Sequence, residues 1–141
     1  MSRQRDKGTR LETALERSSI DAGLPAHRQA LHGTRDTGDV IIAEADGHPV
    51  IIECKNYARG YDIAGWLAQA DIEGDNAGTP YRAVVFKLKG VGLANMARQA
   101  VIMRVQVLWD LLRLITAQAA EIERLRHQVD ALTKRARSYL N

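Results

Sequence analysis

The chain has 141 residues, a mass of 15.6 kDa, 45% hydrophobic residues and 26% charged residues, which is typical of one ordinary globular domain. Its 20 Lys and Arg against 17 Asp and Glu give a net charge of +3, too small an excess to establish a polyanionic partner by itself. A single cysteine, Cys54, excludes an internal disulfide framework and a zinc site built from cysteine clusters. No apolar run reaches the ~20 residues that cross a bilayer, and the N-terminus lacks the apolar stretch of a secretory signal. We therefore expect a cytoplasmic protein without a membrane partner.

The first predicted element is an amphipathic helix over residues 10–22, whose apolar side chains recur at helical spacing. Either Gly8 or Thr9 is expected to cap its beginning, and Gly23 lies where a left-handed residue commonly ends a helix. The basic residues before this helix outnumber the acidic ones. They form a positively charged beginning that either contacts phosphates or stays solvated.

Two short β-branched runs, residues 39–45 and 48–55, predict the first strands. The Asp46-Gly47 pair between them predicts a β-hairpin with a loop of about three residues. Pro49 would begin the second strand, where its missing N–H is tolerated. We therefore expect an antiparallel pair of strands in this part of the chain.

Asp62 would cap a second helix over residues 62–78. Its inward face is expected to consist of Ile63, Trp66, Leu67 and Ala70. Two more strands are predicted over residues 81–89 and 100–105, followed by the beginning of a helix over residues 107–115. This alternation of helices and strands predicts an α/β fold with a mixed β-sheet flanked by helices.

The C-terminal part of the chain has a different pattern, in which residues recur in alternating steps of three and four. These residues are Ile115, Gln118, Ile122, Leu125, Val129, Leu132, Ala136 and Tyr139. An apolar seam of this kind over roughly three heptads predicts a coiled-coil-like helix. The helix either packs on its own domain or joins copies of the chain, and we favour a homodimer or higher homo-oligomer. The chain would then divide into a domain over residues 1–114 and an oligomerisation helix over residues 115–141.

Acidic residues and a lysine interrupt the otherwise apolar strands. Because side chains alternate along a strand, Glu53 and Lys55 would point to one face of the sheet and Cys54 to the other. A hairpin can bring Asp39 beside Glu53 at the end of the sheet. With the backbone carbonyl of Cys54 between them, the two carboxylates form a hard-oxygen site suited to Mg²⁺, with Mn²⁺ as a substitute. Glu12 from the first helix would complete the metal shell directly or through water.

In such a site the Lys55 ammonium would orient the attacking water or stabilise charge on a phosphate. Placing two acids and a lysine in apolar strands costs stability unless they pair with each other or with a metal. The alternative is that Glu53 and Lys55 form an ordinary pair that faces solvent.

Other chemistries have little support in the sequence. The four histidines lack the spacing of paired metal ligands, and Cys54 is expected to be an inert packing thiol. Trp66 and Trp109 lie at helical spacing with aliphatic residues, so we expect both in the core.

The acidic residues and the lysine resemble the signature of the PD-(D/E)xK nuclease superfamily, and within it the small Holliday junction resolvases of archaea and phages. The matching stretches are KGTRLETAL, TRDTGDVII, VIIECKN and GWLAQADIEGDNAG. Gly38 stands where the name of the superfamily has proline. The resemblance implies a restriction-endonuclease-like mixed β-sheet flanked by helices, to which this chain adds its C-terminal helix.

The resemblance also implies roles for individual residues. Glu12, Asp39 and Glu53 would bind the divalent metal, and Lys55 would be the catalytic lysine. Gln69 would lie beside the site and help to arrange water or phosphate, unless it is a surface residue of an amphipathic helix. The residues expected to contact the DNA backbone are Arg3, Arg5, Lys7 and Arg10. Lys87 and Lys89 would do likewise, or lie at a solvated strand edge.

The activity that the resemblance implies is Mg²⁺-dependent endonucleolytic cleavage of four-way (Holliday) DNA junctions during recombination and repair, in a prokaryotic or phage-infected cell. Hydrolysis would leave a 5′-phosphate and a 3′-hydroxyl, and a two-fold dimer would cut two strands symmetrically. One alternative is another DNA nuclease of the same superfamily, of the repair or restriction type. The other is a DNA-binding oligomeric scaffold that has lost catalysis.

Overall fold

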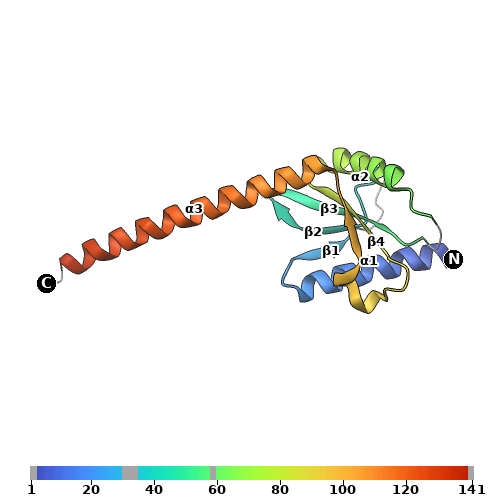
Figure 1. The fold of residues 1–141 in the computed structure, drawn as a ribbon, viewed down its shortest axis with the longest axis horizontal. Coiled ribbons are helices and arrows are strands. Elements are labelled where there is room, and N and C mark those ends of the chain that lie inside the picture. The colour runs from blue at the N-terminus through green and yellow to red at the C-terminus, as the bar shows by residue number, and fades with distance from the viewer. Residues whose placement is uncertain (1–2, 30–34, 58–59, 140–141) are drawn as a thin grey trace. The chain divides into compact units, whose positions relative to one another are not determined.

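The computed structural model describes residues 3–29, 35–57 and 60–139, the side chains of residues 3–5 excepted (Figure 1). The chain divides into two compact units, Met1–Leu108 and Trp109–Asn141. The elements are α1 (Arg3–Asp21), β1 (Ala26–Arg28), β2 (Val40–Ala45), β3 (His48–Lys55), α2 (Ile63–Ala77), β4 (Arg82–Phe86), the 3₁₀ helix η1 (Leu93–Arg98), β5 (Ala100–Ile102) and α3 (Val105–Ser138).

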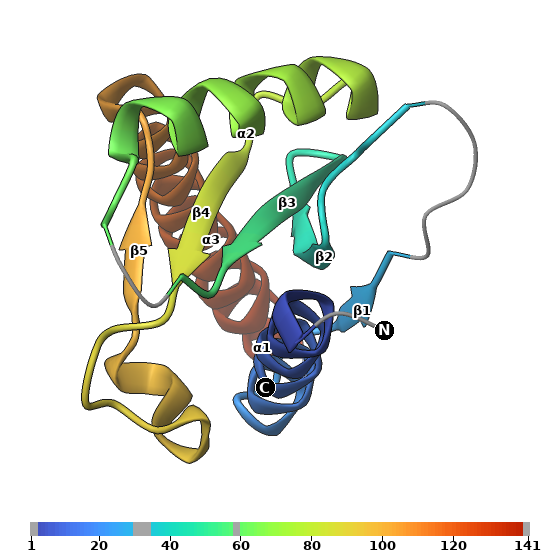
Figure 2. The ribbon, with the colours of Figure 1, turned by 90° about the vertical axis from the view of Figure 1, so that its right-hand side faces the viewer.

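The strands of the first unit form one mixed sheet in the order β1-β2-β3-β4-β5. All neighbouring strands are antiparallel except β3 and β4, which are parallel and are joined through α2. Figure 2 shows α1 and α2 on opposite sides of this sheet. The predicted fold class, a mixed sheet flanked by helices and followed by a C-terminal helix, is therefore confirmed.

The β2–β3 hairpin closes with a turn of two residues, because Ala45 pairs with His48. Both turn residues have positive φ, 51° at Asp46 and 75° at Gly47, which is the backbone of a type I′ turn. The predicted hairpin is thus confirmed, but the expected loop of three residues is wrong. The type I′ geometry matches the twist of the strands and lets pairing continue to the last residue before the turn.

Each face of the sheet has its own hydrophobic core. Leu11 and Leu15 of α1 pack with side chains from one face, including Cys54 of β3. Trp66 and Ala70 of α2 pack with side chains from the other face, which are Val84 and Phe86. The alternation along β3 and β4 therefore sends neighbouring residues to different cores, as the sequence predicted for Glu53, Cys54 and Lys55.

Two helix details differ from the predictions. Helix α1 begins at Arg3 and includes the expected cap residues Gly8 and Thr9 in its interior, because the preceding residues contain no helix breaker and a single glycine is tolerated. Ile63 was expected to face inward but is exposed, since it is the first residue of α2 and precedes the turn that packs on the sheet. The predicted cap Asp62 is confirmed, as its side chain accepts a hydrogen bond from Gly65 N.

The strand predicted over residues 48–55 is confirmed as β3, and that over 39–45 as β2 to within one residue, whereas the two later strands were predicted too long. Strand β4 ends at Phe86, so Lys87 and Lys89 follow the strand and do not alternate along it. Strand β5 is three residues long, and the 3₁₀ helix before it was not predicted. Strand β1 was also missed, because three residues are too few to show a period.

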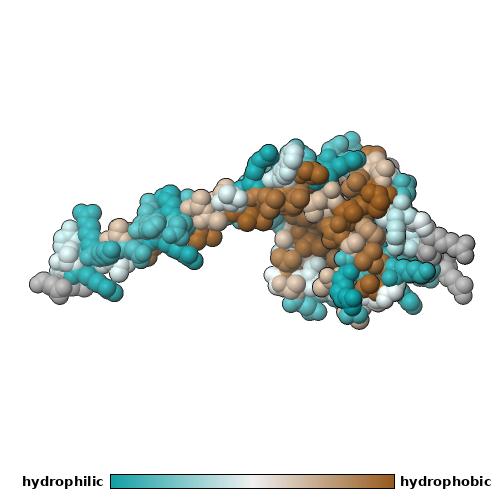
Figure 3. Space-filling view, viewed as in Figure 1, coloured by the Kyte–Doolittle hydropathy of each residue, from teal (hydrophilic) through white to brown (hydrophobic). Residues whose placement is uncertain are grey.

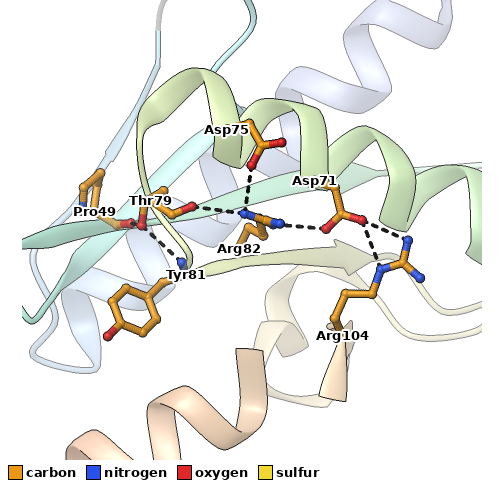
Figure 4. A network of polar contacts seen from close by, with 7 residues as sticks. All are labelled: Pro49, Asp71, Asp75, Thr79, Tyr81, Arg82 and Arg104. Atoms are coloured by element: carbon orange, nitrogen blue, oxygen red, sulfur yellow. Dashed lines mark hydrogen bonds and ion pairs between the residues drawn. The ribbon is translucent and has the colours of Figure 1, made fainter. Parts of the chain in front are cut away.

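An ion-pair network fixes the outer side of α2 to the strands (Figure 4). Asp71 of α2 accepts hydrogen bonds from Arg82 Nε at 3.0 Å and from Arg104 Nη2 at 2.9 Å. Thr79, just after α2, donates to the carbonyl oxygen of Pro49 in β3 at 2.7 Å. These bonds support the orientation of α2 in which Trp66 and Ala70 face the sheet.

The second unit is helical, and most of its apolar side chains are exposed, although Leu111 and Leu114 are half-buried. Along α3 the seam residues Ile122, Leu125 and Leu132 are between 45% and 65% exposed, and hydrophobic and charged residues lie side by side (Figure 3). The expectation that Trp109 is a core residue is wrong, because this tryptophan is 52% exposed in a unit that contains one helix. In the described part of the chain, no helix has the length and apolar character required to span a membrane.

We expect Gly47→Ala to lower the free energy of unfolding by about 1 kcal/mol, because alanine is strained at positive φ. A Cβ at Gly47 would meet no atom within 4 Å, so the loss would come from the backbone alone. The matched control is Gly92→Ala, at a glycine with φ −71° and equally open surroundings, which should leave stability unchanged or slightly raised. Urea unfolding of both variants measures the difference, and equal midpoints would contradict it.

Candidate functional site

Strand β3 places two ionisable side chains in the interior next to α2. Glu53 and Lys55 are both buried, with residue exposures of 5% and 7%. The Lys55 ammonium donates a hydrogen bond to Glu53 Oε1 at 2.5 Å. The alternative of an ordinary solvent-facing pair is therefore wrong, since the sheet face that carries these residues is covered by α2.

Gln69 connects this pair to a third acid. Its side-chain nitrogen donates to Glu53 Oε1 at 2.9 Å and to Glu73 Oε1 at 2.8 Å. Its oxygen accepts from Lys55 Nζ at 2.5 Å. The amide thus has a donor role toward both carboxylates and an acceptor role toward the ammonium. Gln69 is part of the buried network, and the alternative of a surface glutamine is wrong.

Glu73 is a residue of the site that the sequence analysis missed. It is 1% exposed, and its Oε2 atom has no hydrogen-bond partner among the described residues. The Oε2 atom lies beside Gly38, where an added Cβ would approach it to 3.7 Å. A signal was present in the sequence, because Glu73 follows Gln69 by one helical turn and shares its face with Ala70.

Asp39 directly precedes β2, and both its backbone N–H and its carbonyl oxygen form hydrogen bonds. Its N–H donates to the carbonyl oxygen of Ile52 at 3.0 Å, and its carbonyl oxygen accepts from Gln29 N at 2.8 Å. The carboxylate Oδ2 accepts from Cys54 N at 2.7 Å. The hairpin therefore brings Asp39 alongside the strand that carries Glu53, as the spacing in the sequence predicted.

The acids of the site have unusually high pKa values. Burial raises the pKa of Asp39 from an ordinary 3.8 to about 7, and repulsion from Glu53 adds to the rise. Burial raises the pKa of Glu53 from 4.5 to about 7, and repulsion from Glu73 contributes, although the hydrogen bond from Lys55 opposes it. Burial also raises the pKa of Glu73. Among the described residues, Lys55 is the one cation hydrogen-bonded to this group, so three acids share one positive charge.

The remaining two groups of β3 behave differently. Burial alone would lower the pKa of the Lys55 ammonium, but its hydrogen bond and attraction to Glu53 outweigh burial and raise it. Lys55 therefore stays positively charged at neutral pH. Burial and the nearby Asp39 raise the pKa of the Cys54 thiol, so the expectation of an inert packing thiol is consistent with its place in the α1 core.

Glu12 lies on α1, which covers the opposite face of the sheet from α2. Its Oε2 accepts two hydrogen bonds from Arg28 of β1, at 2.6 Å from Nη2 and 3.1 Å from Nε. Glu12 and Asp39 are close enough for their charges to interact. The structure thus places Glu12 next to Asp39 but pairs it with an arginine that the sequence analysis did not identify.

The donor set fits a divalent metal in part. Asp39 and Glu53 offer hard carboxylate oxygens, and their mutual repulsion would be relieved by a bound cation. No group of three or more His, Cys, Asp or Glu in the described ranges is arranged to hold a metal ion. The third oxygen would have to come from Glu12 after release from Arg28, from the Cys54 carbonyl, or from water.

Four of the basic residues considered above line one cleft of about 580 Å³ at the end of the sheet: Lys7, Arg10, Lys87 and Lys89. The side chains of Arg3 and Arg5, which were also predicted to contact DNA, lie outside the described residues. The structure therefore brings the beginning of α1 together with the segment after β4, although the sequence separates them widely.

Comparison of the sequence with protein-family models and with curated proteins gives no match. Among solved structures, the chain is similar to a bacterial homing endonuclease, I-Ssp6803I, with 12% sequence identity and a TM-score of 0.41. The similarity covers 87% of this chain and 99% of that chain. At this TM-score the two folds coincide only in part, so we infer the function of this chain from its own residues.

The raised pKa values predict how stability depends on pH when metal is removed by EDTA. Between pH 4 and 7 the folded state binds more protons at Asp39 and Glu53 than the unfolded state does, so stability falls as pH rises through this range. Both acids are half ionised in the folded state near pH 7, so the loss ends about one pH unit higher. Adding Mg²⁺ or Mn²⁺ at pH 8 should then raise the melting temperature by on the order of 5 °C.

Asp39→Asn should reduce both the fall with pH and the stabilisation by metal, because the amide keeps an oxygen for the Cys54 N–H but carries no charge. The matched control is Glu44→Gln, an exposed acid on the same strand, which should behave as wild type. Melting curves measured by circular dichroism across pH decide the matter. Identical pH profiles for wild type and Asp39→Asn would contradict the prediction.

Proposed function

We propose that the chain is a metal-dependent endonuclease that resolves four-way DNA junctions by phosphodiester hydrolysis. The observation that carries the proposal is the cluster of Asp39, Glu53 and Lys55 around the end of a buried strand, with Gln69 bonded to two of them. These are the residue types that phosphodiester hydrolysis needs, namely carboxylates for a divalent ion and a cation for the phosphate.

Asp39 and Glu53 would hold Mg²⁺, which would lower the pKa of an attacking water and offer positive charge to the phosphate. The residues of the chain do the rest. Lys55 holds its proton and faces the phosphate with a fixed positive charge, which counters the charge that develops on the phosphate oxygens. Gln69 keeps the ammonium in place through its side-chain oxygen. Water attacks phosphorus, the 3′ oxygen leaves, and a 5′-phosphate and a 3′-hydroxyl result.

The basic cleft supports a DNA substrate. Lys7 and Arg10 on α1 and Lys87 after β4 provide positive charge next to the end of β3. Phosphate contacts of this kind do not read sequence, so selection would depend on the shape of the DNA. A four-way junction requires two symmetric cuts, so we also propose that the enzyme acts as a homodimer or higher homo-oligomer joined through α3.

Incubation of the purified chain with a synthetic four-way junction and Mg²⁺ should give paired symmetric nicks, and EDTA should abolish them. Asp39→Asn should lower the cleavage rate by about 10²–10³-fold, the scale seen when one electrostatic group is removed from an active site, because the proposed metal loses a charged ligand. Denaturing gels of strand-specifically labelled junctions measure both results.

The matched control is again Glu44→Gln, which should cleave at the wild-type rate because Glu44 is exposed and remote from the network. Faster cleavage of plain duplex or flapped DNA than of junctions would reject the resolvase and favour another nuclease. Junction binding without any cleavage would favour the catalytically silent scaffold, for which the Glu12–Arg28 pair is a specific indication.

A further inference from the structure

The basic cleft also contains aromatic side chains that the catalytic proposal does not use. Two tyrosines line it, Tyr57 after β3 and Tyr61 before α2, and they are 46% and 49% exposed. The cleft lies next to the end of β3. Lys87, which lines it, donates its backbone N–H to the carbonyl oxygen of Lys55, the last residue of β3, at 3.0 Å. Its volume of about 580 Å³ is within the ~300–1,000 Å³ range of small-molecule pockets.

The tyrosines are held in fixed orientations by a buried aromatic cluster. Tyr57 stacks on Trp66 with ring centroids 5.7 Å apart and an angle of 21° between the rings. Tyr61 packs edge-on against Trp66 at 5.9 Å and against Phe86 at 5.2 Å. Trp66 and Phe86 belong to the α2 core, so the two exposed rings rest on a rigid base.

The charged residues that line this cleft are all cations, while Asp62, the cap of α2, lines an adjoining pocket with the same two tyrosines. The lining residues include Lys7, Arg10 and Lys89, and none of them is paired with a carboxylate in the part of the chain that the structure describes. Asn56 fixes one wall of the cleft, since its side-chain nitrogen donates to the carbonyl oxygen of Lys7 at 2.9 Å. Exposed aromatic rings beside unpaired cations are the combination that binds single-stranded nucleic acid, by stacking on bases and pairing with phosphates.

We propose that this cleft binds an unpaired segment of DNA, with at least one base stacked on Tyr57 or Tyr61 and the flanking phosphates on the cations. The inference rests on the proposed function for the identity of the ligand as DNA. It adds a preference for single-stranded over duplex DNA, which phosphate contacts alone do not give. An unpaired base exposes a ring face that a base within a duplex does not. A base that leaves its pair at the branch point of a junction would offer such a face next to Lys55.

The test uses full-length protein in EDTA, so that neither metal nor cleavage is involved. Fluorescence anisotropy measures the binding of labelled oligothymidylate and of a duplex of equal length. The double variant Tyr57→Ala/Tyr61→Ala should weaken single-strand binding by about 10-fold or more, with little change for the duplex. The matched control Tyr57→Phe/Tyr61→Phe keeps both rings and should bind the single strand like wild type.

Lys87→Ala should weaken the binding of both probes and reduce the salt dependence by about one phosphate contact. Equal losses for single strand and duplex in the double alanine variant would overturn the stacking proposal, as would no loss at all. Because cleavage is measured separately, tyrosine-dependent binding without nuclease activity would reject the proposed function and leave this inference standing.

A second inference, independent of the first, concerns the second unit. Along its helix the β-branched residues Ile115, Ile122 and Val129 occupy one heptad position, called a. Leu125 and Leu132 occupy the other core position, called d. All five side chains are at least 45% exposed. Within parallel coiled coils, β-branched residues at a with leucine at d favour two strands over three or four.

The polar residues of this helix agree with that arrangement. Gln118 is the polar d residue, and in a parallel, in-register pair it faces its own counterpart, so the two amides can bond to each other. In an antiparallel pair it would face an apolar a residue. Glu121 and Arg126 flank the seam at positions that meet across a parallel pair, with opposite charges. Their present partners, Arg124 and Glu123, are exposed and exchange at little cost.

We infer that a second copy of this chain covers the seam, as a parallel two-stranded coiled coil in register. Gln118→Cys should then convert almost completely to a disulfide-linked dimer under mild oxidation, since equivalent d residues face each other. The matched control is His127→Cys, on the outer face of the helix, which should stay largely uncrosslinked. The native Cys54 is buried and should not contribute.

Light scattering should give the mass of a dimer for the wild type and of a monomer for Ile122→Asp. A monomeric wild type would overturn the self-association, and a trimer or tetramer would overturn the two-stranded coil. Equal cross-linking of Gln118→Cys and His127→Cys would overturn the parallel register, while circular dichroism confirms that the variants keep their helix.

Discussion

The constraint on which this structure depends is the burial of several acids with one lysine. Glu53 and Glu73 lie in a low-dielectric interior, where a carboxylate is costly unless it is paired and hydrogen-bonded. Lys55 and Gln69 supply the available donors, and one oxygen of Glu73 is left without any among the described residues. Apolar side chains of similar size would give a more stable core. The cost is understandable where a cation and a phosphate are to be bound.

The rest of the first unit holds this cluster in place. Trp66 and Ala70 bury one face of α2 against the sheet, and the bonds from Arg82 and Arg104 to Asp71 favour the same orientation of the helix. Gly38 lets the backbone pass beside Glu73 with a φ of +92°, a conformation that other residues rarely adopt. Asp39 follows directly and is fixed by the Cys54 N–H. Local backbone geometry and long-range contacts therefore both help to position the carboxylates of Asp39 and Glu73.

Much of this arrangement could be predicted from the sequence, because it depends on short-range rules. Strand alternation placed Glu53 and Lys55 on one face, and the Asp46-Gly47 turn defined the hairpin. What could not be predicted depends on tertiary packing. The pairing of Glu12 with Arg28 joins a helix to a three-residue strand that has no period of its own. The sequence carried a signal for the burial of Glu73, but its hydrogen bond from Gln69 and the approach of Gly38 depend on how α2 packs on the sheet.

The two units have complementary roles in the proposed mechanism. The first unit carries one acidic cluster, and in the proposed mechanism one cluster cleaves one DNA strand. The seam on α3 carries no catalytic chemistry, but a parallel pair attaches both copies of the first unit at the same end of the coil, because α3 is continuous from Val105. An antiparallel pair would attach them at opposite ends, separated by tens of ångströms at about 1.5 Å per residue. The chemistry of the a and d positions therefore bears directly on whether two clusters can act on one branched DNA.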